Sequence, residues 1–153
     1  LQSYLPFTFV SYSSKDSEYL PYVLKILVNH GANPYIDKGD QRLPSPPSSK
    51  TAEVLKDTIK KSKKMVVFVT SNSKDSKWIP WELGLGDGMK TKEHIVIFPS
   101  AEKSYETEWL EQEYLGLYKR IVYGKLQNYD NDVWMVYDSE SNTGIELSRW
   151  LIS

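Results

Sequence analysis

The sequence contains no cysteine, and this absence excludes disulfide bonds and thiolate metal sites. Its only histidines, His30 and His94, are isolated and have no metal-ligand spacing, so we expect neither a metal nor a bound cofactor. The 19 basic and 20 acidic residues leave a net charge of −1, which argues against nucleic acid or an anionic membrane as a partner. Apolar runs stay short of the roughly 18 residues that span a bilayer, and no signal-peptide pattern is present. A cytoplasmic protein is therefore expected.

The rest of the composition is that of an ordinary globular protein. With 153 residues, of which 40% are hydrophobic and 25% charged, the chain is long enough to bury a substantial core but short for two domains. We therefore expect one domain over residues 1–153.

Apolar runs and breaker residues predict alternating strands and helices. Residues 65–69 and 95–98 are continuous apolar runs, the pattern of strands buried on both faces of a parallel sheet. Further strands are expected at 7–12, 33–37 and 133–137, and helices between 17 and Gly31 and at 51–62, 76–87, 107–118 and 144–152. Right-handed crossovers then give an α/β fold, a flavodoxin-like doubly wound five-stranded parallel sheet of order 2-1-3-4-5 with helices on both faces.

Two polar stretches lie between these elements. Residues 38–49 contain Gly39 and three prolines, which predicts a long loop after the second strand. The lysines at 60, 61, 63 and 64 follow the second helix, and we interpret them as a solvated face rather than a binding patch.

Several motifs of related folds are missing. Gly84, Gly86 and Gly88 match neither GxGxxG nor a phosphate-binding loop, and we interpret them as the end of a helix. A receiver-type phosphorylation domain needs acidic residues after its first strand, where this chain has Ser11-Tyr12-Ser13-Ser14. Neither histidine has the spacing of a serine-histidine-acid set.

The best indication of chemistry is the pair Trp78 and Glu82. Four residues apart, they lie one turn from each other on the predicted helix, and a flat aromatic ring beside an acid suits a sugar or a nucleotide base. The pair is equally compatible with an ordinary half-buried helix edge. In a doubly wound sheet, ligands bind beyond the carboxyl ends of the strands at the switch point, where the loops after the first and third strands meet. Trp78 and Glu82 are expected there, which favours a functional role for Glu82.

The ordered set of motifs resembles the Toll/interleukin-1 receptor (TIR) domain family over residues 7–98. The motifs are Phe9-Val10-Ser11-Tyr12 with Asp16, Tyr35-Ile36-Asp37 before a loop with glycine and proline, Ile59, Ser62, Val66–Thr70, Ser73, Ser76, Trp78 and Glu82-Leu83. The Trp-x-x-x-Glu spacing is most similar to the bacterial or plant-type branch that cleaves NAD+.

This resemblance implies that Glu82 is the catalytic carboxylate and that Trp78 lies against the nicotinamide or ribose of NAD+, which is a substrate and not a cofactor. The implied contacts to the rest of the dinucleotide come from Ser11, Tyr12, Ser13, Asp16, Lys38, Gly39 and Arg42. Some members carry basic residues where this chain has Ser13 and Ser14, which leaves Lys15, Lys38 or Arg42 to bind phosphate.

The resemblance also implies partners. The loop with Arg42, Leu43 and Pro44 is expected to associate with other TIR domains, and the product, ADP-ribose or a cyclic or modified form, to signal to a downstream effector in immune or antiphage defence. The competing interpretations are a protein interaction module without chemistry and a nucleoside-processing transferase with a glutamate nucleophile. Single residues have alternatives too: Asp16 as a helix cap, Tyr12 as a residue closing the sheet, and Trp81 as a packing residue whose ring points away from Trp78.

Overall fold

A computed structural model describes residues 6–39, 48–100 and 113–153 of the chain. Three residues of the predicted assembly loop, Arg42, Leu43 and Pro44, lie outside these ranges, as does most of the helix expected at 107–118. No helix among the described residues is long and apolar enough to cross a membrane.

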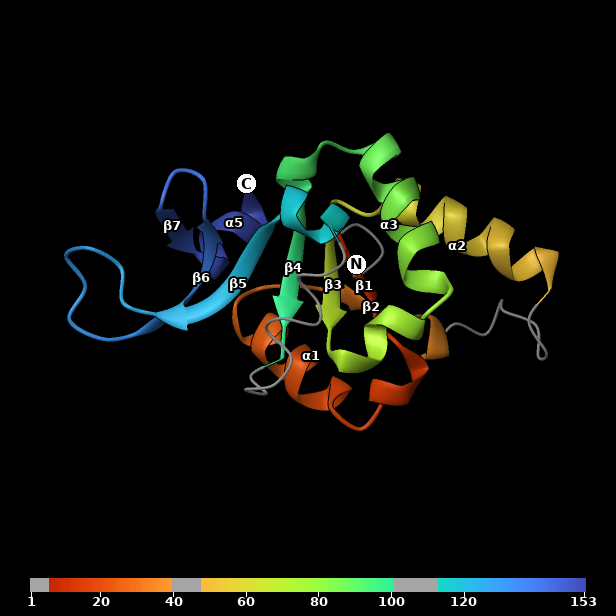
Figure 1. Cartoon of the computed structure of the whole chain (residues 1–153), viewed down its shortest axis with the longest axis horizontal. Coiled ribbons are helices and arrows are strands. Elements are labelled where there is room, and N and C mark those ends of the chain that lie inside the picture. Colours follow the sequence, from red (N-terminus) through yellow and green to blue (C-terminus); the bar gives the residue numbers. More distant parts are fainter. Residues whose placement is uncertain (1–5, 40–47, 101–112) are drawn as a thin grey trace.

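The described chain alternates strands and helices through its first two thirds and is mainly strand after that (Figure 1). The strands are β1 (Thr8–Ser11), β2 (Pro34–Tyr35), β3 (Lys64–Val69), β4 (Ile95–Pro99), β5 (Lys119–Gly124), β6 (Val133–Asp138) and β7 (Thr143–Glu146). The α-helices are α1 (Leu20–Asn29), α2 (Ser49–Lys61), α3 (Trp78–Met89) and α5 (Leu147–Ile152). Short 3₁₀ helices are η2 (Ser14–Asp16), η3 (Asp37–Gly39), η4 (Ser71–Asp75), η5 (Lys92–His94) and η6 (Glu113–Leu117).

The seven strands form one sheet of order β2-β1-β3-β4-β5-β6-β7. The first five in this order are parallel, as predicted, but the fifth parallel strand is β5 and not the stretch at 133–137. That stretch is β6, which pairs antiparallel with β5 and then with β7. The connection from β5 to β6 is too short for the dozen or more residues of a parallel crossover, so the chain turns back as a hairpin. The closing helix, expected from 144, starts at Leu147 because β7 takes the preceding residues.

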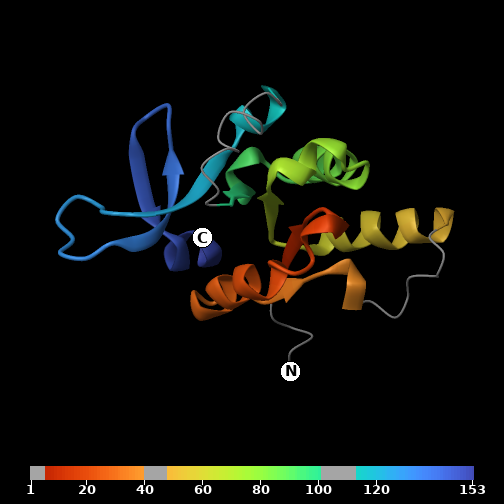
Figure 2. The same ribbon diagram turned by 60° about the horizontal axis from the view of Figure 1, so that its bottom comes forward.

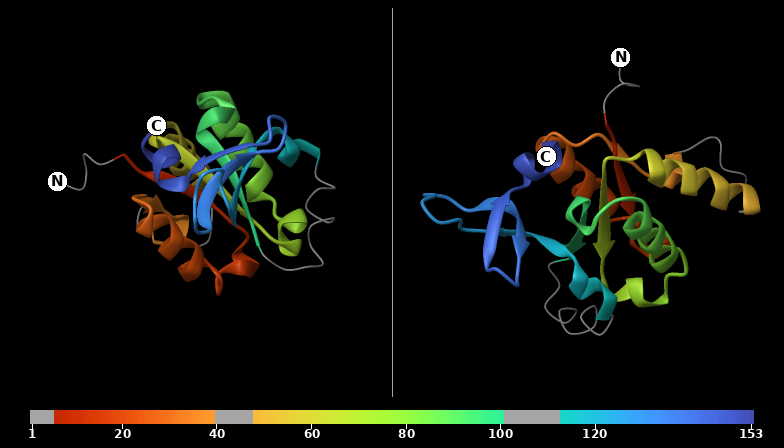
Figure 3. Two further views of the ribbon diagram at one scale, coloured as in Figure 1. Left: turned by 90° about the vertical axis from the view of Figure 1, so that its left-hand side faces the viewer. Right: turned by 90° about the horizontal axis from the view of Figure 1, so that it is seen from above.

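Helices cover both faces of the sheet, as predicted (Figures 2 and 3). On one face, α2 and α3 pack on alternate strand residues through Leu55, Ile59, Ile79 and Leu83. On the other face, α1 and α5 pack on the intervening residues and form a second core. All six residues of β3 are buried, so the centre of the sheet is a rigid base for the loops at its carboxyl edge.

The three glycines at 84, 86 and 88 lie in the second half of α3, which ends at Met89. Gly86 has a packing role, since a Cβ atom added there would lie 2.5 Å from the Met65 sulfur. The small residue therefore lets α3 lie close to β3, and the helix continues to Met89 despite the low helix propensity of glycine.

We expect Gly86→Ala to destabilise the protein by about 1–3 kcal/mol, because the added methyl group displaces a fully buried methionine. Gly84→Ala is the matched control, since nothing lies within 4 Å of its added Cβ, and it should stabilise the helix by up to about 1 kcal/mol. Urea denaturation of both variants measures the difference. Equal effects would show that α3 does not depend on this close approach.

Lys64 does not belong to a solvated lysine face, which corrects the prediction, because it begins β3 and is 1% exposed. Its ammonium Nζ lies 2.8 Å from Nδ1 of His94 and donates to the Ser153 hydroxyl at 3.0 Å, over the ring of Trp150. Burial, together with the charge of Lys63, lowers the pKa of Lys64 to about 8. The side chain thus ties β3 to η5 and to the end of α5.

Candidate active site

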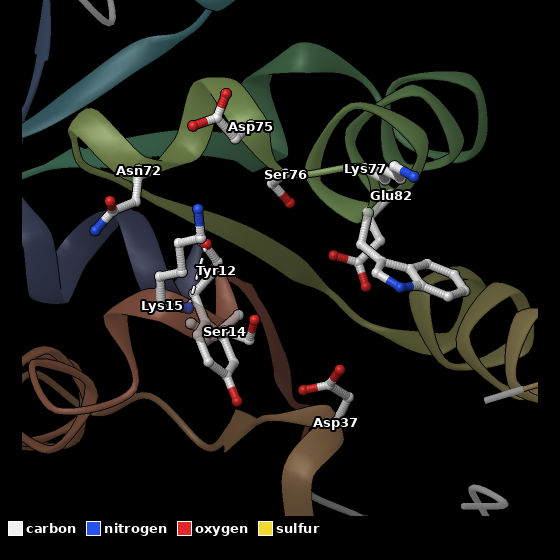
Figure 4. Close-up of a pocket in the computed structure, with 12 residues that line it drawn as sticks. Tyr12, Ser14, Lys15, Asp37, Asn72, Asp75, Ser76, Lys77 and Glu82 are labelled. Carbon is white, nitrogen blue, oxygen red and sulfur yellow. Dashed lines mark hydrogen bonds between the residues drawn. The ribbon is translucent and has the colours of Figure 1, made fainter. Parts of the chain in front are cut away.

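A cavity of about 310 Å³ opens at the carboxyl edge of the sheet, where the loops after β1 and β3 meet (Figure 4). Its lining residues come from β1 and the loop after it, from η3, and from the segment that runs from η4 into the first half of α3. They are Val10, Tyr12, Ser13, Ser14, Lys15, Asp37, Asn72, Asp75, Ser76, Lys77, Trp78 and Glu82. This is the switch-point position at which the sequence predicted a site.

Glu82 forms the most buried polar part of the cavity wall. Glu82 is only 4% exposed, and its Oε1 accepts a hydrogen bond of 2.6 Å from the Ser11 hydroxyl at the end of β1. Burial raises the pKa of Glu82 to about 8, the Ser11 hydrogen bond opposes this rise, and the charge of Asp37 adds to it. Glu82 therefore keeps its proton to a higher pH than an ordinary glutamate does.

Tyr12 and Asp37 form a second polar pair in the cavity. The Tyr12 hydroxyl interacts with the Asp37 carboxylate. Burial and this interaction with Asp37 raise the pKa of Tyr12 to about 12, so its proton stays in place at physiological pH. In Figure 4 the Asp37 and Glu82 carboxyl groups point toward one another across the cavity.

Asp16 is not among the residues that line the cavity. It is fully buried, and its two carboxylate oxygens accept hydrogen bonds from the Thr70 hydroxyl at 2.7 Å and the Asn72 amide at 2.8 Å. These bonds join the β1 loop to the β3 loop. The geometry favours an organising role for Asp16 over the predicted contact with substrate.

The remaining predicted contact residues differ in whether they line the cavity. Ser13 lies on the cavity wall, and its hydroxyl accepts from the amide of Lys15, which also lines the cavity. Lys38 is exposed in η3 next to Asp37 and does not line the cavity. Gly39 ends η3, and Arg42 lies outside the described residues.

Trp78 and Trp81 lie side by side, which contradicts the prediction that their rings point to different sides of α3. The rings meet edge to face, with centroids 5.4 Å apart, and the residues are 39% and 37% exposed. The prediction considered only the angle between the two residues around the helix. Residues three apart are neighbours on a helix surface, so their rings are close enough to meet. Trp78 lines the cavity, while Trp81 supports its ring from outside.

Sequence reasoning did not select Asp37 as a site residue, nor the polar cavity residues Asn72, Asp75, Ser76 and Lys77. A signal for Asp37 was available, since it follows β2, the strand next to β1, and the carboxyl ends of parallel strands share one edge. Within the described parts of the chain, no group of three or more His, Cys, Asp or Glu side chains is placed to hold a metal ion.

Comparison with known proteins identifies the class to which this fold and site belong. The TIR domain family matches residues 8–133, and the chain belongs to that family. A relative from Bacillus cereus (strain MSX-D12) is 30% identical over 145 residues, which are 94% of this chain and 74% of the relative. Its name is "Probable 3' cyclic ADP-D-ribose synthase ThsB'".

A solved structure with a similar fold contains the TIR domains of the activated Roq1 resistosome directly recognizing the pathogen effector XopQ. The similarity has a TM-score of 0.46 and 22% sequence identity, and it covers 62% of this chain and 57% of that one. The chain thus spans less than two thirds of the length of that structure.

Proposed function

We propose that this protein cleaves the bond between nicotinamide and ribose in NAD+, with Glu82 as the catalytic carboxylate. The observation that supports this most is the position of Glu82, a buried carboxyl group on the wall of a cavity whose rim is an exposed tryptophan. Trp78 supplies a flat surface for the nicotinamide ring, and the cavity is large enough for one end of a dinucleotide.

Cleavage of this bond mainly requires electrostatic stabilisation of the transition state. As the bond breaks, nicotinamide takes the bonding electron pair and leaves as a neutral molecule, so no strong general acid is needed. The ribose is left with oxocarbenium character, and an anion beside it stabilises the transition state more than the ground state. Glu82 in its ionised form supplies this anion, and Ser11 holds the carboxylate in place through the 2.6 Å hydrogen bond.

The relative's name favours a cyclic product over simple hydrolysis. Both reactions pass through the same ribosyl cation and differ only in which hydroxyl attacks it, that of water or one within the ADP-ribose chain. We propose cyclisation as the main outcome, with the product acting as a signal to an effector in defence. Self-association with other TIR domains and the absence of a bound cofactor belong to the same proposal.

The alternative is a TIR domain that acts only as an interaction scaffold. Such a module has no use for a buried carboxyl group of raised pKa on a cavity wall, and its ionisation would only destabilise the fold. An NAD+-cleaving enzyme is distinguished from a scaffold by incubating the protein with NAD+ over a range of protein concentrations and separating the products by chromatography. Nicotinamide and a cyclic ADP-ribose are expected, and intact NAD+ at every concentration would favour the scaffold.

Trp78→Ala is expected to lower kcat/KM for NAD+ by about 10- to 100-fold, because stacking on an aromatic side chain contributes about 1–3 kcal/mol per base. Trp81→Ala removes only the edge-to-face contact, worth about 0.5–1.5 kcal/mol, and should lower kcat/KM by no more than about tenfold. Steady-state kinetics and thermal melts of both variants test this. Unchanged kinetics per folded Trp78→Ala molecule would return Trp78 to a structural role.

A further inference from the structure

Asp37 is placed to act on the same substrate as Glu82, from the opposite side of the cavity. It follows β2 and begins η3, whereas Glu82 comes from α3, so the two carboxyl groups reach the cavity from separate elements. Both line the cavity, and in Figure 4 their carboxyl groups face each other. The charge of Asp37 acts on Glu82, which indicates electrostatic communication across this space.

The two carboxyl groups have different surroundings. Glu82 is buried and accepts from the Ser11 hydroxyl, while Asp37 is half-buried and interacts with the Tyr12 hydroxyl. A pair of carboxyl groups in unequal environments commonly divides acid-base and electrostatic roles between its members. Enzymes that cleave glycosidic bonds place two carboxyl groups around the sugar in this way.

We propose that Asp37 is the general base for the second half of the reaction, a role that rests on the proposed cleavage of NAD+. After nicotinamide has left, a hydroxyl oxygen from the ADP-ribose chain or from water forms the new bond to the ribosyl carbon. Its O–H bond breaks, and the proton passes to the Asp37 carboxylate and then to solvent. In hydrolysis, NAD+ and water give ADP-ribose, neutral nicotinamide and one proton. In cyclisation the attacking hydroxyl belongs to NAD+ itself, so NAD+ alone gives the cyclic product, nicotinamide and one proton.

Tyr12 is the positioning residue in this arrangement. Its hydroxyl interacts with the Asp37 carboxylate and keeps its own proton, so it can orient the carboxylate without competing for the proton of the attacking hydroxyl. Tyr12 comes from the β1 loop and Asp37 from η3, and both line the cavity.

A nucleophile without a proton separates this role from that of Glu82. The ring nitrogen of 3-acetylpyridine attacks the ribosyl cation and exchanges with nicotinamide without releasing a proton, so exchange needs Glu82 but no general base. We expect Asp37→Asn to lower the formation of cyclic and hydrolysed products by about 100-fold, the usual scale of general-base catalysis, and to keep exchange within about threefold of wild type. Tyr12→Phe should lower the ratio of hydroxyl-dependent products to exchange, by a smaller factor than Asp37→Asn.

Asp132→Asn, the same chemical change in the exposed turn between β5 and β6, is the matched control and should leave both reactions unchanged. Thermal melts confirm that each variant is folded. If Asp37→Asn loses exchange and hydroxyl-dependent products by the same factor, or keeps both, Asp37 is not the base. If the wild type at high concentration neither releases nor exchanges nicotinamide, the proposed function itself fails.

Discussion

Glu82→Gln is expected to lower nicotinamide release from NAD+ by about 100-fold or more, with the fold intact. Glutamine has the same shape and can still accept the hydrogen bond from Ser11. It lacks the negative charge that faces the developing ribosyl cation, and loss of one preorganised electrostatic contact at a reacting centre commonly lowers kcat by about 10²–10³. Nicotinamide release and base exchange should fall together, since both need the same cation.

The control for this change is Glu53→Gln, which alters an exposed residue on α2 in the same chemical way and should not affect the rate. Nicotinamide release per milligram is measured by chromatography at matched protein concentrations. A Glu82→Gln variant that keeps more than about a third of the wild-type rate would remove Glu82 from the catalytic role.

Much of the fold could be predicted from local patterns. The continuous apolar runs of β3 and β4 and the periodic helices between them define a parallel sheet with both faces covered, and the order of the first four strands follows from right-handed crossovers. The C-terminal part was harder because β5, with its half-buried residues, has no continuous apolar run. Because β5 was not predicted, residues 133–137 were assigned as the fifth parallel strand. The antiparallel end of the sheet was therefore not predicted either.

The candidate site shows a similar division. Trp78 and Glu82 could be selected because their spacing is a property of one helix. Asp37 could not be selected from spacing, since its significance depends on a contact with Tyr12 and on a cavity shared with Glu82, both of which arise between elements. The buried network of Asp16 with Thr70 and Asn72 is likewise a product of two loops meeting, and nothing in the local sequence separates it from a helix cap.

The raised pKa of Glu82 has a consequence for activity. The group has to lose its proton before it can act as an anion, and burial opposes this in the empty cavity. Bound NAD+ brings the positive charge of its nicotinamide ring, and an adjacent positive charge lowers the pKa of a carboxyl group. The free enzyme is therefore expected to show kcat/KM for NAD+ that rises with pH up to about 8, in keeping with the pKa of Glu82.

The same pKa predicts that Glu82→Gln stabilises the protein more as the pH increases. Folded Glu82 holds its proton up to about pH 8, whereas the unfolded side chain loses it near 4.5, so the folded state binds more protons between these values. The unfolding free energy that Glu82 contributes is present in full below about pH 4.5 and is lost as the pH rises through 8. Glutamine cannot ionise and does not show this loss.

We therefore expect Glu82→Gln and wild type to have similar stability at pH 5, and the variant to be more stable at pH 9 by several kcal/mol, since one pKa unit corresponds to about 1.4 kcal/mol. Urea denaturation of both proteins at pH 5, 7 and 9 measures this difference, and every other titrating group cancels because both proteins carry it. Glu53→Gln, at an exposed position, should remain parallel to wild type across the range. A difference between Glu82→Gln and wild type that stays constant from pH 5 to 9 would mean that Glu82 is ionised in the empty site throughout. A buried carboxyl group that becomes less favourable as it acquires the charge needed for catalysis is a stability–activity conflict of the kind expected at an active site.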